Sequence, residues 1–495
     1  MHLAYPALLA GIDLLCGAAA ALTGDLYYFL IPLCVHALFR MHLYRGIFFV
    51  LFAYAYTLLI YPPHYPTEPK TPGNAAFSIR SLKLASSAFG KNYMYEGTLS
   101  TFTAEDGTAY RNLPCRIMIP LKKNRLPASC NYIMEGTLCA KEGRNFFFKP
   151  ISWTPLPGWN VAETRFLAKT AVSNYLKRHL KDPKVASFFS SLATGDIDER
   201  ALSLEFGKIG VNHLLAISGF HFALLTAFCS FILRLFLPHK ATTLLLLIVL
   251  SAYFFFVGNA PSVQRAWIGI FIFLIGSLFD LRSNALNSLG CALCIEVLID
   301  PYCVTHLGFQ LSFLATLAIL LLYAPCEKLF SLLLPKRPLS LLAVMTPLHQ
   351  TGHLFSSMIR KALALNIAVH LVTLPVLLFV FLKFPWLSLL YNLFFPFWVG
   401  IAIFLLLFSL IFPPLHALNN AFTSALLQLP AHSPALWQFY LRTKTLPYPM
   451  VIGLLLLFFC LGILYKEPAL RAQLFSGLIT RWHQATGYRF FRRNT

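Results

Sequence analysis

Long apolar segments constrain this chain more than any other feature of its sequence. A helix that crosses a bilayer needs roughly 20 consecutive apolar residues. Only 12% of the residues are charged, against roughly 25% in soluble domains, so a single water-soluble globule is excluded. We predict a polytopic α-helical membrane protein with about 10–12 spans. The apolar segments lie near 7–23, 26–39, 46–62, 212–236, 242–258, 263–281, 284–299, 303–325, 362–383, 386–413 and 449–465.

The basic residues predict how these spans are oriented. The net charge is +21, a bias that suits an inner-membrane topology, an anionic partner or both. Arg40 and Arg45 flank the second connection, and the connection 326–361 carries Lys and Arg against only Glu327. Both connections are predicted to be cytoplasmic, which places the polar segment 63–160 outside. The segment 414–440 is either a span or a surface helix, so the side of the tail stays open.

Composition also divides the chain into five parts. A stretch from Val161 to Lys184 has apolar residues at every fourth position and lysines elsewhere, which is typical of an interfacial helix. The predicted parts are N-terminal transmembrane helices (1–62), an extracytoplasmic β domain (63–160), amphipathic helices (161–210), a transmembrane domain (211–465) and a basic tail (466–495).

The polar segment 63–160 has the pattern of a small β domain. The sequence Tyr-Met-Tyr-Glu-Gly-Thr-Leu at 93–99 nearly recurs as Tyr-Ile-Met-Glu-Gly-Thr-Leu at 132–138. Turn signals separate the apolar alternation of the intervening residues. A β repeat in so short a segment indicates an OB-like barrel, closed or half closed. The predicted strands are 93–102, 116–120, 132–140 and 145–149.

This β domain interleaves aromatic residues with cations, twelve Lys and Arg against six Asp and Glu. Such a surface is typical of proteins that bind single-stranded nucleic acid, in which cations follow the phosphates and aromatic rings stack on bases. In the more common alternative the rings fill the barrel and the cations are solvated. The candidate DNA-binding residues are Arg80, Lys83, Lys91, Tyr93, Tyr95, Arg111, Arg116, Lys122, Lys123 and Arg125.

The cysteines and the standard catalytic motifs give little support for an enzyme. The eleven cysteines are scattered, mostly within apolar segments, so we predict no metal site and no cofactor. Cys115, Cys130 and Cys139 lie in the polar segment, where one disulfide is open if it faces an oxidising compartment. No G-x-x-x-x-G-K-[ST] sequence occurs, so we expect ATP hydrolysis to be supplied by another protein.

Four motifs in order point to a known family. The first runs from Thr194-Gly195-Asp196 through Gly210 to the sequence His-Leu-Leu-Ala-Ile-Ser-Gly-Phe-His at 213–221. This pattern resembles the signature of the competence DNA-uptake channel family (ComEC), with Phe220 in place of the more usual Leu. The resemblance covers about residues 1–465. Further matches are Gly258, Pro261, Ser262, Arg265 and Ala266; Gly308 to Phe313 with Ala315; and Asn392 with Pro396.

The resemblance implies a channel in the bacterial inner membrane that conducts transforming DNA, as a single strand, into the cytoplasm. A DNA receptor, a nuclease and a cytoplasmic motor would then be separate proteins, with membrane lipid around the channel. Many family members carry a C-terminal metallo-β-lactamase-like domain. Its H-x-H-x-D-H cluster does not occur in this sequence, so we expect no nuclease activity here. The oligomeric state is not predicted.

Physical reasoning supports a polar path through the helices. Arg265 lies near the start of an apolar segment, and a charge in hydrocarbon costs at least about 2.5–3.5 kcal/mol unless it faces water or a partner. We therefore expect it to face a polar cavity. Small and polar residues also hold helices together without any channel function. The candidate path residues are Asp196, His213, Ser218, Gly219, His221, Arg265, Gln310, Ser312 and Asn392.

Three alternatives remain open. His213 and His221 are eight residues apart, so on one helix they would point within about 80° of each other, and Ser218 beside them allows an intramembrane serine hydrolase. A transporter for a small anion or a lipid-linked precursor would use the same basic cavity. Asp196, Asp198 and Glu199 suit a metal ion, although a helix cap or a solvated turn is the commoner role.

Overall fold

A computed structural model of the chain describes residues 5–25, 27–38, 43–66, 68–87, 90–121, 125–140, 146–197, 199–258, 260–281, 284–432, 439–468 and 471–472. Lys122, Lys123, Asp198 and nearly all of the basic tail lie outside these residues. The chain divides into two compact units. The first comprises Met1–Pro32, Tyr44–Ser312 and Pro385–Leu441, and the second comprises Leu33–Leu43, Phe313–Phe384 and Arg442–Thr495.

The helices confirm a polytopic α-helical membrane protein. Nine helices of the described residues are long and apolar enough to cross a bilayer, and two shorter apolar helices accompany them. The long helices are α1 (Pro6–Thr23), α3 (Leu43–Ile60), α7 (Gly219–Arg234), which forms a span over Asn212–Arg234 together with the residues before it, α8 (His239–Val257), α9 (Pro261–Leu278), α11 (Leu307–Phe330), α13 (Pro347–Phe381), α14 (Leu387–Ser409) and α16 (Tyr448–Lys466). The shorter ones are α2 (Tyr27–Leu38) and α10 (Ala285–Ile299).

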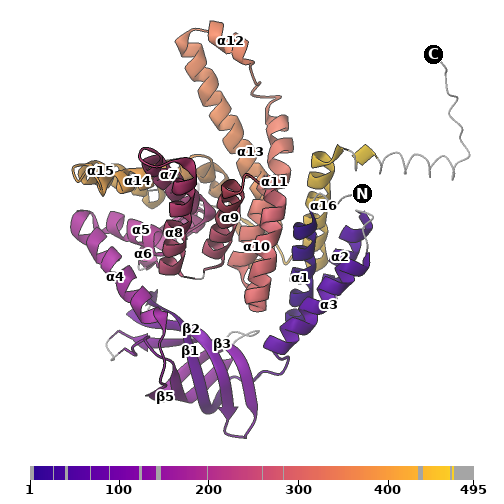
Figure 1. Cartoon of the computed structure of the whole chain (residues 1–495), viewed down its shortest axis with the longest axis vertical. Coiled ribbons are helices and arrows are strands. Elements are labelled where there is room, and N and C mark those ends of the chain that lie inside the picture. The colour runs from indigo at the N-terminus through magenta and orange to yellow at the C-terminus, as the bar shows by residue number, and fades with distance from the viewer. Residues whose placement is uncertain are drawn as a thin grey trace, which may run out of the picture. The chain divides into compact units, whose positions relative to one another are not determined.

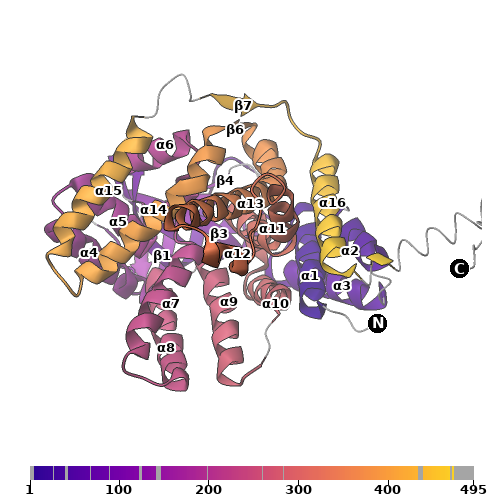
Figure 2. The same cartoon turned by 90° about the horizontal axis from the view of Figure 1, so that it is seen from above.

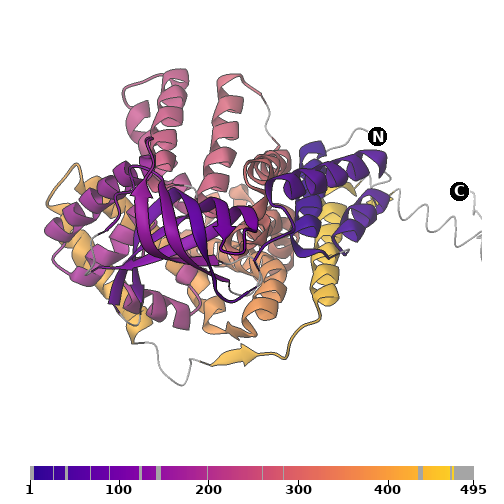
Figure 3. The same ribbon diagram turned by 90° about the horizontal axis from the view of Figure 1, so that it is seen from below.

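The β domain is a closed five-stranded barrel in the order β1-β2-β3-β5-β4. Only β3 and β5 pair in parallel, and the other neighbours are antiparallel. Figure 3 shows the strands from below. The sequence analysis did not predict β1, in which Phe77 and Ile79 are buried in the core and a bulge between Ile79 and Ser81 shifts the alternation before the buried Leu82. The strands are β1 (Thr71–Ser87), β2 (Gly90–Ala104), β3 (Ala109–Pro120), β4 (Tyr132–Ala140) and β5 (Phe146–Pro155).

The repeated Glu-Gly-Thr-Leu sequence has a steric reason. A Cβ atom on Gly97 would lie 2.1 Å from the carbonyl oxygen of Ser78, and one on Gly136 would lie 2.2 Å from the carbonyl oxygen of Lys149. Both distances are far inside van der Waals contact, so each glycine lets a neighbouring strand approach closely. The repeat thus marks two equivalent close approaches in the barrel wall.

Aromatic side chains fill the interior of the barrel. Tyr95, Phe102, Phe146 and Phe148 are all at most 2% exposed. The Tyr95 hydroxyl donates a hydrogen bond to the carbonyl oxygen of Leu126 at 2.7 Å, and burial raises the pKa of Tyr95 to about 12, so the hydroxyl stays a donor. For these rings the packing alternative is correct.

The cysteines of the barrel are free thiols. Cys115 is buried in the core, where burial raises its pKa to about 12. A thiol with so high a pKa is a poor nucleophile at neutral pH. The open question of a disulfide among Cys115, Cys130 and Cys139 is therefore answered by three reduced residues in this structure.

The barrel lies at helix ends of the first unit (Figure 1), where an ion pair and hydrogen bonds hold it. Arg80 of β1 forms an ion pair with Asp300 at 2.7 Å, directly after α10 ends. Tyr61, directly after α3 ends, donates to the same carboxylate at 2.7 Å. The Arg165 side chain donates to the carbonyl oxygen of Phe255 near the end of α8 at 2.8 Å. The carboxyl ends of α3, α8 and α10 therefore lie at the barrel.

Short connections then place the amino ends of α9 and α11 on the same side. Only residues 258–260 separate α8 from α9, and only a 3₁₀ turn, η2 (Pro301–Thr305), and His306 lie between Asp300 and α11. Ser262 at the start of α9 donates to the carbonyl oxygen of Ile217 at 2.7 Å, which brings the amino end of α7 there too. The opposite ends carry Arg234 and Lys240, the charge distribution expected if the barrel is extracytoplasmic.

Helices α4 (Val161–His179), α5 (Pro183–Thr194) and α6 (Arg200–Lys208) form a cluster with α14 and α15 (Leu415–Ala431). Figure 2 shows α4, α5 and α15 side by side. The sequence places Lys169 off the apolar stripe of α4, yet in the structure it is buried with Phe166 and Ser173. Within 414–440, α15 buries Asn419 and Thr423 and is not among the helices with the length and composition of a span.

The second unit contains α13, α16 and most of α11. A Cβ atom on Gly462 of α16 would lie 2.6 Å from the Cβ atom of Leu321 on α11, so this glycine allows close helix packing. Arg360 of α13 is 3% exposed and donates to the carbonyl oxygen of Leu334 at 2.9 Å. The buried charge thereby stabilises the loop that follows α11.

Candidate functional site

The centre of the predicted motif forms the amino end of α7. Ser218 is the N-cap residue, with extended φ and ψ of −127° and 173°. Its amide donates to Nδ1 of His221 at 3.1 Å, and its hydroxyl lies 2.9 Å from the same nitrogen. Reciprocal contacts of this kind form a capping box, which satisfies donors that the first helical turn leaves without partners.

This geometry corrects the prediction that His213 and His221 share one helix. His213 is in a separate 3₁₀ turn, η1 (Asn212–Leu214), and is exposed, whereas His221 is 6% exposed. The helix begins only at Gly219 because the serine before it caps the chain. The Nε2 atom of His221 is buried and has no hydrogen-bond partner among the described residues.

Arg265 brings a positive charge to this helix end. A Cβ atom on Gly219 would lie 3.4 Å from Nη2 of Arg265, so the guanidinium rests against the first turn of α7. Its Nη1 donates to the backbone carbonyl oxygen of Ser312 at the start of α11. The predicted residues Ser218, Gly219, His221, Arg265 and Ser312 thus come together from three helices.

The electrostatics of this cluster favour an anion. The amino end of a helix carries a partial positive charge and unpaired amide donors, and a guanidinium adds a full positive charge and five donors. Two positive features that converge at one place repel each other unless a negative group lies between or beside them. A phosphate oxygen meets both requirements of charge and hydrogen bonding.

The nearby acidic residue is Glu296 of α10, which the sequence analysis missed. Its side chain is 2% exposed, and it interacts electrostatically with Arg265. Its Oε1 atom is buried without a hydrogen-bond partner among the described residues. The same signal that identified Arg265, an ionisable residue inside an apolar segment, was present for Glu296.

Two other predicted path residues, Asp196 and Gln310, have partners outside the Arg265 cluster. Asp196 forms an ion pair with the buried Lys169 at 3.1 Å, and burial lowers the pKa of that lysine although Asp196 opposes the shift. The Gln310 amide donates to the carbonyl oxygen of Val304 at 2.9 Å. These contacts fix the α5 terminus and the turn before α11, and they do not join the Arg265 cluster.

Asn392 belongs to a second packing point, on α14. Its amide donates to the Ser388 hydroxyl at 3.0 Å. A Cβ atom on Gly210 would lie 2.6 Å from the Cβ atom of Ser388, and Gly210 has a φ of +74°. Only glycine tolerates that φ in so crowded a place, so Gly210 and Asn392 set the approach of α14.

The structure gives the serine hydrolase alternative no support from geometry. The Nδ1 atom of His221 that lies near the Ser218 hydroxyl already accepts the Ser218 amide. A base in a catalytic triad is instead oriented by a carboxylate at its second nitrogen, and Nε2 of His221 has no such partner among the described residues. Capping accounts for the Ser218 and His221 pair. The described residues also contain no group of acids, cysteines and histidines suited to a metal ion.

Of the predicted cations that the structure describes in the barrel, Arg80, Lys83, Arg116 and Arg125 are paired. Lys83 and Arg116 contact Glu96 at 2.9 Å and 3.3 Å. Burial of Glu96 opposes its ionisation, but these two cations outweigh it and lower the pKa of the carboxyl. Arg125 donates to Glu163 at 3.1 Å and lies over the ring of Phe166.

The structure corrects the role of one predicted tyrosine, and a second stays a predicted DNA contact. Tyr95 is fully buried, so it is not available to stack on a base. Tyr93 packs edge to face against Phe166 of α4. Lys91 and Arg111 are exposed and stay predicted DNA contacts. The exposed aromatic side chains that the sequence analysis missed are Trp153 and Trp159, which are 42% and 79% exposed.

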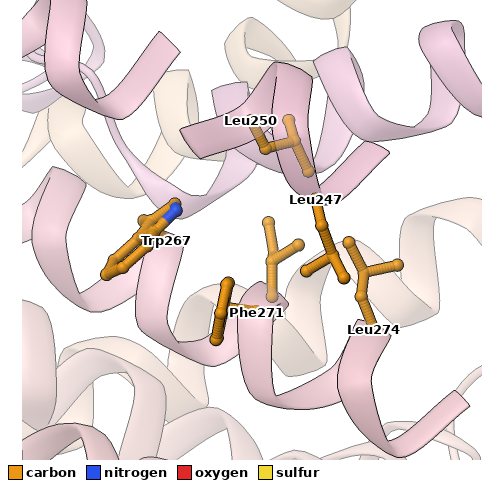
Figure 4. A pocket seen from close by; sticks show the side chains of 6 residues that line it. Leu247, Leu250, Trp267, Phe271 and Leu274 are labelled. Carbon is orange, nitrogen blue, oxygen red and sulfur yellow. The ribbon is translucent and has the colours of Figure 1, made fainter. Parts of the chain in front are cut away.

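A pocket between α8 and α9 has a different character. Figure 4 shows Leu247, Leu250, Trp267, Phe271 and Leu274 around it. All of its lining side chains are apolar except for the indole nitrogen of Trp267, which donates to Ser251 at 3.1 Å. Such a lining suits hydrocarbon and not a polyanion.

Comparison with known proteins agrees with the motifs. A family model described as "Competence protein" matches residues 193–469, which include the Arg265 cluster. The chain belongs to the competence protein family. It is also 30% identical over 195 residues to ComE operon protein 3 of Bacillus subtilis (strain 168). That match covers 39% of this chain and 23% of the relative, so this competence protein aligns with less than a quarter of its relative. No solved structure matches the chain.

Proposed function

We propose that this protein takes part in DNA uptake during competence and conducts a single DNA strand across the bacterial inner membrane. The observation that carries the proposal is the convergence of Arg265 and the amino end of α7 at the barrel side of the helices. A strand of DNA carries one negative charge per nucleotide, and lipid offers that charge no compensation. A cationic site at the mouth of the helices supplies it.

In this proposal the barrel receives the strand and the Arg265 cluster binds its phosphates in turn. Exposed Lys91 and Arg111 and the exposed ring of Trp159 provide charge and a stacking surface on the barrel. A phosphate that reaches Arg265 replaces the carbonyl oxygen of Ser312 as its acceptor. The structure then corresponds to a closed state, which opens when α7, α9 and α11 separate.

The proposal also assigns partners to this channel. We assign DNA capture outside the cell, degradation of the second strand and pulling of the strand in the cytoplasm to separate proteins. The protein itself is proposed to be a channel and not an enzyme. Lipid surrounds the exposed apolar faces of its helices.

Substitution of Arg265 tests the function. A charged hydrogen bond is worth about 1.5–3 kcal/mol, so Arg265→Gln is expected to reduce phosphate binding about ten- to a hundredfold. The assay measures labelled DNA in a nuclease-protected cytoplasmic pool, in a deletion strain that carries each variant at equal membrane level. The matched control is Arg234→Gln, because Arg234 is exposed at the other end of α7. Normal uptake in the deletion strain would refute the proposal.

The small-anion alternative shares the same cationic site and needs its own comparison. Proteoliposomes that hold the full chain are offered labelled inorganic phosphate and labelled single-stranded oligonucleotide. Uptake of phosphate without binding of the oligonucleotide would favour the transporter. Oligonucleotide binding that weakens steeply with salt indicates phosphate contacts along a strand and favours the channel.

A further inference from the structure

Glu296 is the least expected charged group of the first unit. It lies on α10, an apolar helix of the membrane domain, and is 2% exposed. Carboxylates inside membrane segments are costly, and they commonly take part in proton transfer. The Oε1 atom of Glu296 has no hydrogen-bond partner among the described residues, so one carboxylate oxygen is buried without compensation.

The groups around Glu296 come from three packed elements. From α9, Arg265 interacts with it electrostatically. From η2, Cys303 interacts with it, and Tyr302 lies in the same turn. Helix α1 packs along α10 and carries Asp13 and Cys16, where Asp13 interacts with Cys294 and Cys16. Arg265 is therefore the cationic partner of Glu296 among these groups.

The pair has a consequence for binding of a second anion. Arg265 with an ionised Glu296 is neutral overall, and a phosphate added to this pair leaves an excess negative charge in a medium of low dielectric. A proton on Glu296 removes that excess. Binding of a phosphate at Arg265 and binding of a proton at Glu296 therefore favour each other, and such coupling is reciprocal by thermodynamic necessity.

We propose that Glu296 binds one proton from the aqueous phase whenever a DNA phosphate binds Arg265, and releases it when the phosphate leaves. The inference rests on the proposed function and adds its regulation by protons. The carboxylate gains the proton and the guanidinium stays charged throughout. A difference in proton concentration across the membrane would then bias the direction in which phosphates pass.

The first test measures protons directly. The purified full chain in detergent, in weakly buffered solution with a pH indicator, is mixed with single-stranded oligothymidine. We expect proton uptake with the wild-type protein and none with Glu296→Gln. Oligothymidine binding by the wild-type protein without proton uptake would overturn the inference and leave the proposed function intact.

The second test measures affinity against pH. One linked proton changes Kd by up to about tenfold per pH unit, so the wild-type protein is expected to bind oligothymidine more tightly as the pH falls. The difference between wild type and Glu296→Gln removes any contribution from His213 and His221 near the amino end of α7. Parallel pH profiles for these two proteins would overturn the inference.

Two further variants control for the possibility that Glu296→Gln fails to fold. Asp13→Asn removes another carboxylate that is buried in the membrane domain and 2% exposed, and we expect it to retain the wild-type pH dependence. Glu296→Asp keeps a titratable group and is expected to retain proton uptake. If the wild-type protein binds no oligothymidine at any pH, the proposed function fails and the inference fails with it. The direct measurement on wild type needs no variant at all.

Discussion

The ion pair between Lys169 and Asp196 allows a sharp test of which motif residues are structural. Lys169 is 9% exposed, and the side chains of the pair retain 11% and 17% exposure. Removing one partner of a buried pair costs about 3–5 kcal/mol because it leaves an uncompensated charge. Asp196 keeps some access to water, so we expect Asp196→Asn to lower the free energy of unfolding by about 2–3 kcal/mol.

A second substitution separates this explanation from a role in the DNA path. Lys169→Met replaces the buried cation with an apolar side chain of similar length, and a buried pair replaced as a whole is often neutral in stability. The double variant Asp196→Asn with Lys169→Met is therefore expected to recover most of the lost stability. Thermal unfolding in detergent and the amount of protein in the membrane measure both effects.

DNA uptake by the same variants completes the test. If Asp196 is structural, uptake follows the amount of folded protein and returns in the double variant. The reasoning would be refuted if Asp196→Asn unfolds at the wild-type temperature, or if the double variant is stable and still takes up no DNA. In the second case Asp196 would contact the strand directly, as the sequence motif alone predicted.

Further predictions concern the barrel and its attachment to the helices. Gly97→Ala forces a Cβ atom to within 2.1 Å of the Ser78 carbonyl oxygen, so we expect a loss of at least about 2 kcal/mol of barrel stability, seen as faster hydrogen exchange in β1 and β2. Lys83 and Arg116 lower the pKa of the Glu96 carboxyl below its ordinary value of 4.5. The ionised carboxylate therefore stabilises the barrel above about pH 4.5, and this stabilisation is lost as the pH falls through the lower pKa of the folded state. Glu96→Gln is expected to remove this loss of barrel stability at acid pH, measured by hydrogen exchange at several pH values. Asp300→Asn removes the charge that holds Arg80 at 2.7 Å, and we expect faster hydrogen exchange in β1 with unchanged hydrogen exchange in α1. A hydrogen-exchange rate in β1 equal to that of the wild type would contradict the attachment of the barrel through Asp300.

Sequence predicted the membrane helices well because a bilayer sets their length and apolarity independently of tertiary contacts. Each of the eleven apolar segments contains an apolar helix of the structure. The barrel was predicted from its repeat, but β1 (Thr71–Ser87) was missed. A bulge between Ile79 and Ser81 breaks the alternation of its buried apolar residues. The strands β2 and β4 that pair with it on either side are not visible in this segment alone.

The site was predicted only in part, for reasons that differ between residues. Arg265 was identified because the cost of a charge in hydrocarbon requires no knowledge of its neighbours. The burial of Lys169 was not predicted, because the apolar residues of α4 fit more than one helical stripe. The pairing of Arg265 with Glu296 joins residues 31 positions apart on different helices, and no local pattern predicts such a contact.

In the proposed channel, the position of Arg265 along α9 determines how readily it exchanges one hydrogen-bond acceptor for another. It lies in the second turn of α9, near the barrel, and its acceptor is the carbonyl oxygen of Ser312 in the second turn of α11. A guanidinium at the centre of the bilayer would hold a phosphate with no water near it, so release would be slow. In the proposed channel, the exchange of a carbonyl for a phosphate would take place at this end of the helices, closer to water than the bilayer centre, where the desolvation cost is smaller. A strand that must move on after each contact requires such exchange, because a site that binds too tightly stops transport.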